Sequence, residues 1–179
     1  MMLCNTLAGV LMFGVHFLAM KMPEETGEYG LFVALLGILT LMMSATPGIQ
    51  TVFTHETAAA TTDLERQRMT YYAYRIIQLT LVLWLLIVCL VTLFHKPIFA
   101  FYKMDRAWPL VITMVAGLLF LWLPVFMGVL QGAQRFSWLG WALLANGGGR
   151  LVVAFLLVMV IGGSAQSVML GVLAGVIIS

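Results

Sequence analysis

The chain has 179 residues, of which 63% are hydrophobic and only 9% are charged, and its formal net charge is +2. Soluble domains contain about 25% charged residues, so in water this chain would expose most of its apolar surface. A lipid environment removes that conflict, and the small net charge argues against a nucleic-acid partner. The composition therefore predicts an integral membrane protein.

The cysteines and histidines show no pattern that indicates a metal site or an active site. Cys4 and Cys89 both lie in apolar runs, as buried small side chains do. His16, His55 and His95 are far apart, and no CxxC or HExxH motif is present. We therefore expect no metal, no cofactor and no enzymatic activity.

The first two apolar runs are residues 3–20 and 30–53, with a short polar stretch between them. Each is near the roughly 20 residues that a helix needs to cross a bilayer core of about 30 Å. Pro47 and Gly48 interrupt the second run near its end, which predicts a kink or a broken last turn.

The longest polar segment, residues 54–75, is followed by a third span at residues 76–94. The composition of residues 54–75 predicts a helix whose N-cap is Thr61, Thr62 or Asp63. Three tyrosines near its end are typical of a membrane interface.

Residues 95–106 form the next expected loop, before a fourth span at residues 107–130 that Pro124 should kink. Residues 151–161 are too short to cross alone, so the fifth span must extend back through Arg150 and the residues before it.

The last apolar run, residues 165–179, measures roughly 22 Å as a helix. The fold class is therefore all-α, a polytopic transmembrane bundle of about six spans. We expect one domain over residues 1–179 that ends inside its sixth span. Residues 54–75 and 131–135 should lie on one side of the membrane, with the loops at 21–29 and 95–106 on the other. Lysines and arginines are too evenly divided to set the orientation.

Four features, taken in order along the chain, resemble the polysaccharide flippases of the multidrug/oligosaccharidyl-lipid/polysaccharide exporter superfamily. They are Glu28-Tyr29-Gly30 after an acidic turn, Thr46-Pro47-Gly48 at the end of the second span, the glycine-rich stretch from Gly128 to Phe136, and Arg150. The resemblance covers essentially the whole chain as the amino-terminal half of such a protein.

The resemblance implies one six-helix lobe of a two-lobe transporter, with its amino terminus inside the cell. Such proteins move undecaprenyl-diphosphate-linked sugar units across the cytoplasmic membrane during polysaccharide and lipopolysaccharide biosynthesis. A sugar diphosphate cannot enter hydrocarbon without a hydrated, cationic path. The expected partners are the lipid-linked oligosaccharide, membrane lipids and proteins of polysaccharide assembly.

Four residues are candidates for substrate binding. Arg150 lies within a span, where a charge costs about 2.5–3.5 kcal/mol, and its guanidinium suits a diphosphate; the alternative is that it snorkels to the headgroups. Asn146 and the glycines at 147–149 precede it. Those glycines allow a bend or the close approach of another backbone or a ligand, and the alternative is a loop before a short or tilted span. Asn5 and His16 share one face of the first span, which either lines the path or packs against a helix.

That face of the first span also carries Gly9, through which we expect helix packing. The two G-x-x-x-G pairs, Gly128/Gly132 and Gly171/Gly175, indicate close helix contacts rather than ligand sites.

Three other functions remain open. A multidrug exporter of the same superfamily usually needs acidic residues in its spans for cation coupling, and none lies in a span here. A membrane scaffold subunit would have no transport of its own. A membrane-embedded transferase would need a carboxylate or histidine cluster, and no D-x-D-like arrangement is present.

Overall fold

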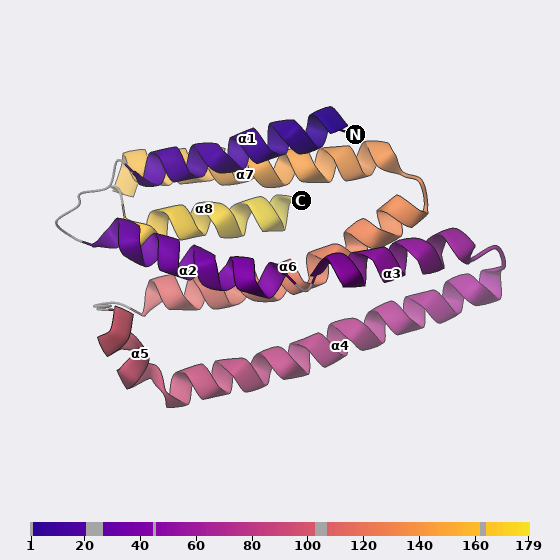
Figure 1. Ribbon diagram of the computed structural model, residues 1–179, viewed down its shortest axis with the longest axis horizontal. Helices are drawn as coiled ribbons and strands as arrows, with labels where there is room; N and C mark the ends of the chain where they lie inside the picture. Colours follow the sequence, from indigo (N-terminus) through magenta and orange to yellow (C-terminus); the bar gives the residue numbers. More distant parts are fainter. Residues whose placement is uncertain (1, 21–26, 45, 103–106, 162–163) are drawn as a thin grey trace.

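The computed structural model describes residues 2–20, 27–44, 46–102, 107–161 and 164–179, and its regular elements there are all α-helices (Figure 1). The helices are α1 (Met2–Ala19), α2 (Glu28–Met43), α3 (Thr46–Ala59), α4 (Asp63–Leu93), α5 (His95–Tyr102), α6 (Trp108–Gly132), α7 (Phe136–Ile161) and α8 (Ala165–Ile178). The predicted all-α class is confirmed.

Four stretches in the described part of the chain are long and apolar enough to cross a membrane. They are residues Glu28–Ala59, Asp63–Leu93, Trp108–Gly132 and Phe136–Val160, with 25 to 32 residues each. Shorter apolar helices, Thr6–Ala19 and Ala165–Ile178, lie beside them. The protein is therefore built for a membrane, and about six spans is compatible with this arrangement.

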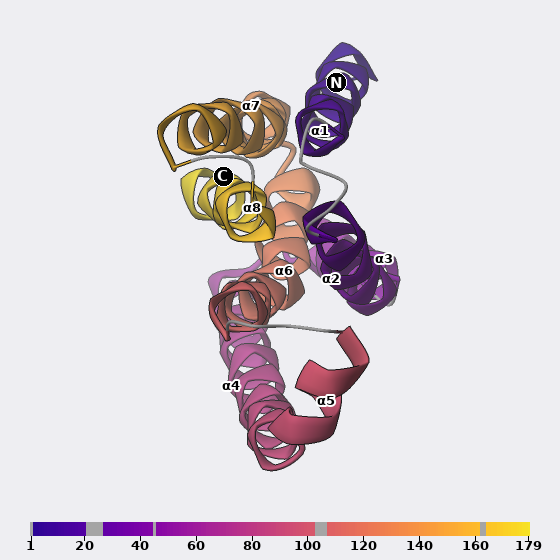
Figure 2. The ribbon, with the colours of Figure 1, turned by 90° about the vertical axis from the view of Figure 1, so that its left-hand side faces the viewer.

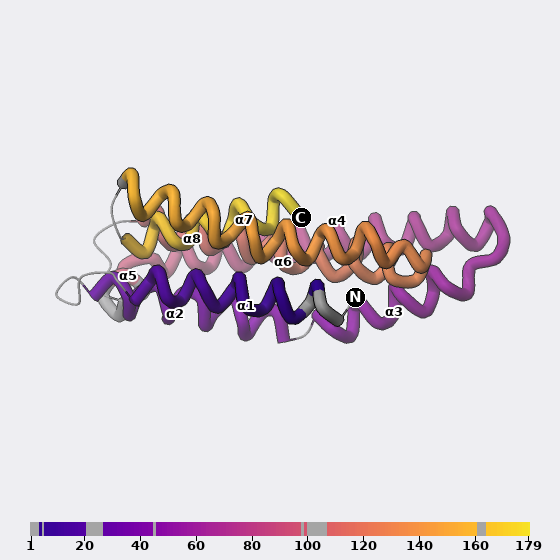
Figure 3. Tube along the Cα trace, turned by 90° about the horizontal axis from the view of Figure 1, so that it is seen from above, coloured from indigo at the N-terminus to yellow at the C-terminus, as the bar shows by residue number. Residues whose placement is uncertain are grey.

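The hairpin of α3 and α4 projects beyond the other helices (Figure 3). At 31 residues, α4 is about 46 Å long. That length exceeds the roughly 30 Å of a hydrocarbon core, so one end of the hairpin must extend into the headgroups or the water beyond them.

The second predicted span is broken just before Pro47, as the sequence indicates. Proline has no N–H to donate to the carbonyl of Met43. The hydroxyl of Thr46 donates to that carbonyl instead, at 2.7 Å, and the hydroxyl of Ser44 donates to the carbonyl of Leu41, also at 2.7 Å. The break therefore keeps these two carbonyls hydrogen-bonded at a depth where water is scarce.

A capping box starts α4 at Thr62, one of the three predicted caps. The Thr62 hydroxyl accepts from the Glu65 N–H at 3.3 Å, and the Glu65 carboxylate accepts from the N–H groups of Thr61 and Thr62 at 2.9 Å each. The predicted polar helix and the third span after it are therefore one continuous helix.

Two sequence-based predictions about local structure are wrong. Residues 95–102, expected to be loop, form the short helix α5. The glycines at 147–149 lie inside the continuous helix α7, so the loop alternative is wrong. The close approach of another backbone is confirmed, because a Cβ atom on Gly147 would lie 2.9 Å from the Ala8 carbonyl oxygen and one on Gly149 would lie 3.2 Å from Cα of Gly175. A glycine costs about 1 kcal/mol in a helix, whereas an unpaired backbone group in lipid costs several kcal/mol, so the helix continues through them.

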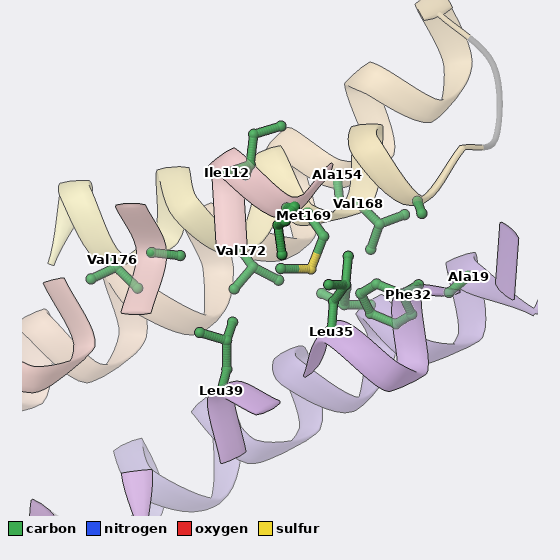
Figure 4. Packing of buried hydrophobic residues seen from close by; sticks show 14 of the residues in the cluster. Ala19, Phe32, Leu35, Leu39, Ile112, Ala154, Val168, Met169, Val172 and Val176 are labelled. Carbon is green, nitrogen blue, oxygen red and sulfur yellow. The ribbon is translucent and has the colours of Figure 1, made fainter. Parts of the chain in front are cut away.

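Helix α6 lies at the centre of the bundle and contacts α2, α3, α4 and α8 (Figure 2). Beside it, side chains of α2 face those of α8 (Figure 4). The fully buried residues of that layer are Phe32, Leu35, Leu39, Val168, Met169 and Val172. By contrast, α4 is at the edge, where Trp84 packs on Gly117 and the Trp122 indole N–H donates to the Thr80 hydroxyl at 3.1 Å.

Both predicted G-x-x-x-G pairs are close helix contacts. A Cβ atom on Gly132 would lie 2.5 Å from the Thr54 carbonyl oxygen, and one on Gly128 would lie 2.6 Å from the Gln50 carbonyl oxygen, so α6 crosses α3 with backbone against backbone. The Gln50 side chain also donates to Gln131, at 3.0 Å.

The expectation of packing through Gly9 is wrong. A Cβ atom there would meet nothing within 4 Å. Its neighbour Ala8 is buried instead, and its carbonyl oxygen would lie 2.9 Å from a Cβ atom on Gly147 of α7. The face of α1 that packs is therefore rotated by one residue from the expected face.

The helix directions predict that the α3–α4 turn and α5 lie on opposite sides of the membrane. Cysteines introduced singly at Thr62 and Lys96, in a variant with Cys4 and Cys89 replaced by alanine, should react with a membrane-impermeant maleimide from opposite sides of sealed vesicles. Labelling of both positions from the same side would contradict the topology.

Gly132→Ala should destabilise the protein by about 1–3 kcal/mol, because the added methyl group overlaps α3. Gly37→Ala is the matched control, since its methyl group meets nothing within 4 Å and alanine favours the helix. Thermal unfolding of both purified variants in detergent measures the difference. Equal midpoints would show that the α3–α6 contact is looser than described.

Candidate functional site

Arg150 lies near the middle of α7, about 21 Å from the first residue of the helix and about 17 Å from the last. The fifth span was expected to extend back through Arg150, and α7 begins at Phe136, 14 residues earlier, so Arg150 lies deep within the helix. Only 8% of the residue is exposed. A snorkelling arginine extends along the lipid-facing surface, whereas this side chain is enclosed by helices.

The guanidinium of Arg150 rests on an aromatic ring of the central helix. Its Cζ atom lies 4.8 Å from the centroid of the Phe120 ring in α6, within the range of a cation–π interaction. In the described part of the chain, its buried Nε has no hydrogen-bond partner and no carboxylate forms an ion pair with it. The ring offsets only part of the cost of burying the charge.

Asn146, one helical turn before Arg150, is the second buried polar residue of this site. It is 2% exposed, and its Nδ2 donates to the Ser179 hydroxyl at 3.4 Å. Its Oδ1 is buried and has no partner among the described residues. One face of α7 thus holds an unpaired donor on Arg150 and an unpaired acceptor on Asn146, together with a positive charge.

Gly175 of α8 provides the space that these two residues occupy. A Cβ atom on Gly175 would collide with Cγ of Arg150 and would lie 2.5 Å from the Asn146 carbonyl oxygen. On the other side of the contact, a Cβ atom on Gly149 would lie 3.2 Å from Cα of Gly175. The two helices therefore meet along glycines, with the arginine side chain lying against the contact.

The other two candidates do not join this site in the described structure. His16 is half-buried, and its ring lies edge-on to Phe32, with the centroids 5.8 Å apart; Phe13 is 6.4 Å away. This places it in the contact of α1 with α2. Asn5 belongs to α1, but its side chain lies outside the described residues. Two of the four candidates, Asn146 and Arg150, are therefore brought together.

Three structural roles were not identified from sequence, two of them beside Arg150 and one at the opposite end of α8. Phe120 is one of many aromatic residues in apolar runs, and nothing in the pattern distinguishes it. Gly175 was recognised as a packing residue but not as the neighbour of Arg150. The Glu28 carboxylate accepts from the Ala165 N–H at 2.7 Å, so it caps the first turn of α8 from α2.

The chemistry available here is a fixed cation with hydrogen-bonding groups, which suits the binding of an anion. Among the described residues, no group of three or more His, Cys, Asp or Glu side chains is placed to hold a metal ion.

Comparisons of this chain with protein-family models, with curated proteins and with solved structures found no match.

Proposed function

We propose that the protein is one lobe of a flippase that moves undecaprenyl-diphosphate-linked sugar units across the cytoplasmic membrane for polysaccharide biosynthesis. The observation that carries the proposal is the buried Arg150, which lies at mid-depth of a spanning helix with no carboxylate beside it in the described residues. The family resemblance of the sequence supports the choice of substrate.

A buried charge without a counter-ion is expensive, and such residues in membrane spans mark binding sites and transport paths. A diphosphate supplies the missing counter-ion. The planar guanidinium forms paired hydrogen bonds with phosphate oxygens, and Asn146 Oδ1 is available to accept from a sugar hydroxyl one helical turn away. Binding would then pair both groups that the described structure leaves unpaired.

Arg150 is only 8% exposed, so the helices around it must move before a substrate can reach it, and we infer that α8 moves away from α7. The two helices touch through Gly149, Gly171 and Gly175, which have no side chains to interlock. Separating such a contact costs less apolar burial than separating interdigitated leucines would. We infer that the described arrangement is the closed state of this part of the lobe, and that opening the α7–α8 contact exposes the arginine during transport.

The positions of the acidic residues favour a sugar-lipid substrate over cation-coupled drug export. In the described residues, carboxylates occur at helix ends, where Glu28, Asp63 and Glu65 occupy the first turns of α2 and α4. Glu56 lies in the last turn of α3. The middle of each described span therefore lacks the acidic side chain that cation coupling uses. The proposed lobe performs no covalent chemistry, and it needs a second lobe to complete the path.

Arg150→Ala should abolish polymer export in cells that depend on the protein, because the diphosphate loses its counter-ion. Arg150→Lys should restore export only in part, since an ammonium lacks the planar fork of donors. Arg75→Ala is the control: that arginine lies on the exposed surface of α4, about 18 Å from the first residue of the helix, and donates to the Tyr71 hydroxyl at 2.8 Å, so its loss should leave export unchanged. Surface polymer and membrane abundance are measured together.

Normal export by Arg150→Ala, at normal abundance, would contradict the proposal. If all three variants were lost from the membrane, the result would show that Arg150 and Arg75 are both needed for folding, and it would contradict a specific transport role for Arg150. Full rescue by lysine would show that a point charge suffices and that no paired phosphate contact forms.

A further inference from the structure

A hollow lies between α3, α4 and α6, away from Arg150. Its volume is about 770 Å³, within the range of roughly 300–1,000 Å³ that ligand sites occupy. One wall is a face of α4 that includes Arg66, Ala73 and Ile77. The opposite wall comes from the end of α6, with Phe126 and Val129, and Arg135 lies in the turn that follows.

The groove is cationic at one end and apolar at the other. Arg66 lies in the first turns of α4, and Ile77 lies about 16 Å further along that helix. Because α6 runs antiparallel to α4 (Figure 1), Arg135 falls at the same end as Arg66, and Phe126 falls deeper. Both arginines are exposed, so their charges are available at the mouth of the groove.

Acidic residues are found in a different hollow of the same hairpin. A neighbouring hollow of about 510 Å³ contains Glu56, Glu65 and Arg68. In the groove itself, Arg66 and Arg135 are the charged residues among the described lining side chains. The carboxylate of Glu65 is held by the capping box of α4. The groove therefore presents two positive charges that its own lining does not neutralise.

We propose that this groove binds an anionic phospholipid from the surrounding bilayer, with its phosphate between Arg66 and Arg135 and an acyl chain along Ile77, Phe126 and Val129. The charge complements a phosphodiester, and guanidinium groups bind phosphate oxygens strongly. The exposed Tyr71, Tyr72 and Trp138 place this end at the membrane interface. The hairpin is already held to α6 through α3. A bound lipid would join α4 to α6 as well.

The apolar walls select a lipid over a free phosphate ion. A small anion would leave most of the groove unfilled, whereas an acyl chain covers apolar surface that otherwise faces disordered lipid or water. The proposal is independent of the transport function, because it concerns different residues at a different depth from Arg150.

Native mass spectrometry of the purified full chain, delipidated and then titrated with phosphatidylglycerol, measures the binding. The wild type should keep at least one phosphatidylglycerol under conditions that strip phosphatidylcholine. Arg66→Gln with Arg135→Gln should weaken this binding by about tenfold or more, equivalent to about 1.4 kcal/mol. Arg68→Gln is the matched control, because its side chain lines the neighbouring hollow and its removal should change binding less than twofold.

A second variant tests the apolar half of the site. Ala73→Leu fills the middle of the groove without altering charge, and it should weaken phosphatidylglycerol binding as well. An excess of inorganic phosphate should fail to displace the lipid. Three results would overturn the proposal: equal binding of phosphatidylcholine and phosphatidylglycerol, retention of the lipid by the double arginine variant, or displacement by phosphate alone, which would make the site a simple anion site.

Discussion

The contact between α7 and α8 is the constraint on which the site depends. Glycines at positions 149, 171 and 175 bring the two helices together until their backbones nearly touch. Gly175 also leaves the space that the Arg150 side chain fills. A larger residue at 175 would push the arginine out or separate the helices, so the close packing of α7 on α8 and the burial of the charge have one cause.

This packing leaves a charged side chain in the interior of the bundle. Most described spans are joined by apolar surfaces and small residues, and the polar links between them are neutral, such as Gln50 with Gln131 and Trp122 with Thr80. Arg150 stands apart as a buried charge whose described neighbour is an aromatic ring. Neutral links stabilise the bundle at little desolvation cost, whereas the arginine adds a cost that binding of an anion would offset.

The sequence predicted the elements more accurately than their ends and their contacts. Apolar run length located each long span, and the proline at 47 and the threonines before Asp63 located a break and a cap, because those signals are local. Whether the helix continues unbroken through residues 147–149 was left open, because glycine propensity in water does not reveal the backbone requirement that lipid imposes. The contacts of Arg150 with Phe120 and Gly175 depend on which helices are neighbours in space. No local sequence pattern predicts which helices those are.

Under the proposed function, Arg150 is kept for binding and not for stability. Arg150→Met tests it most directly, because methionine keeps a long, flexible side chain and removes the charge. We expect the purified variant to unfold at the same temperature as the wild type or higher, because a buried charge without a counter-ion has been removed. We also expect polymer export in cells to be lost. A fall of several degrees in the unfolding temperature, or normal export, would contradict the account.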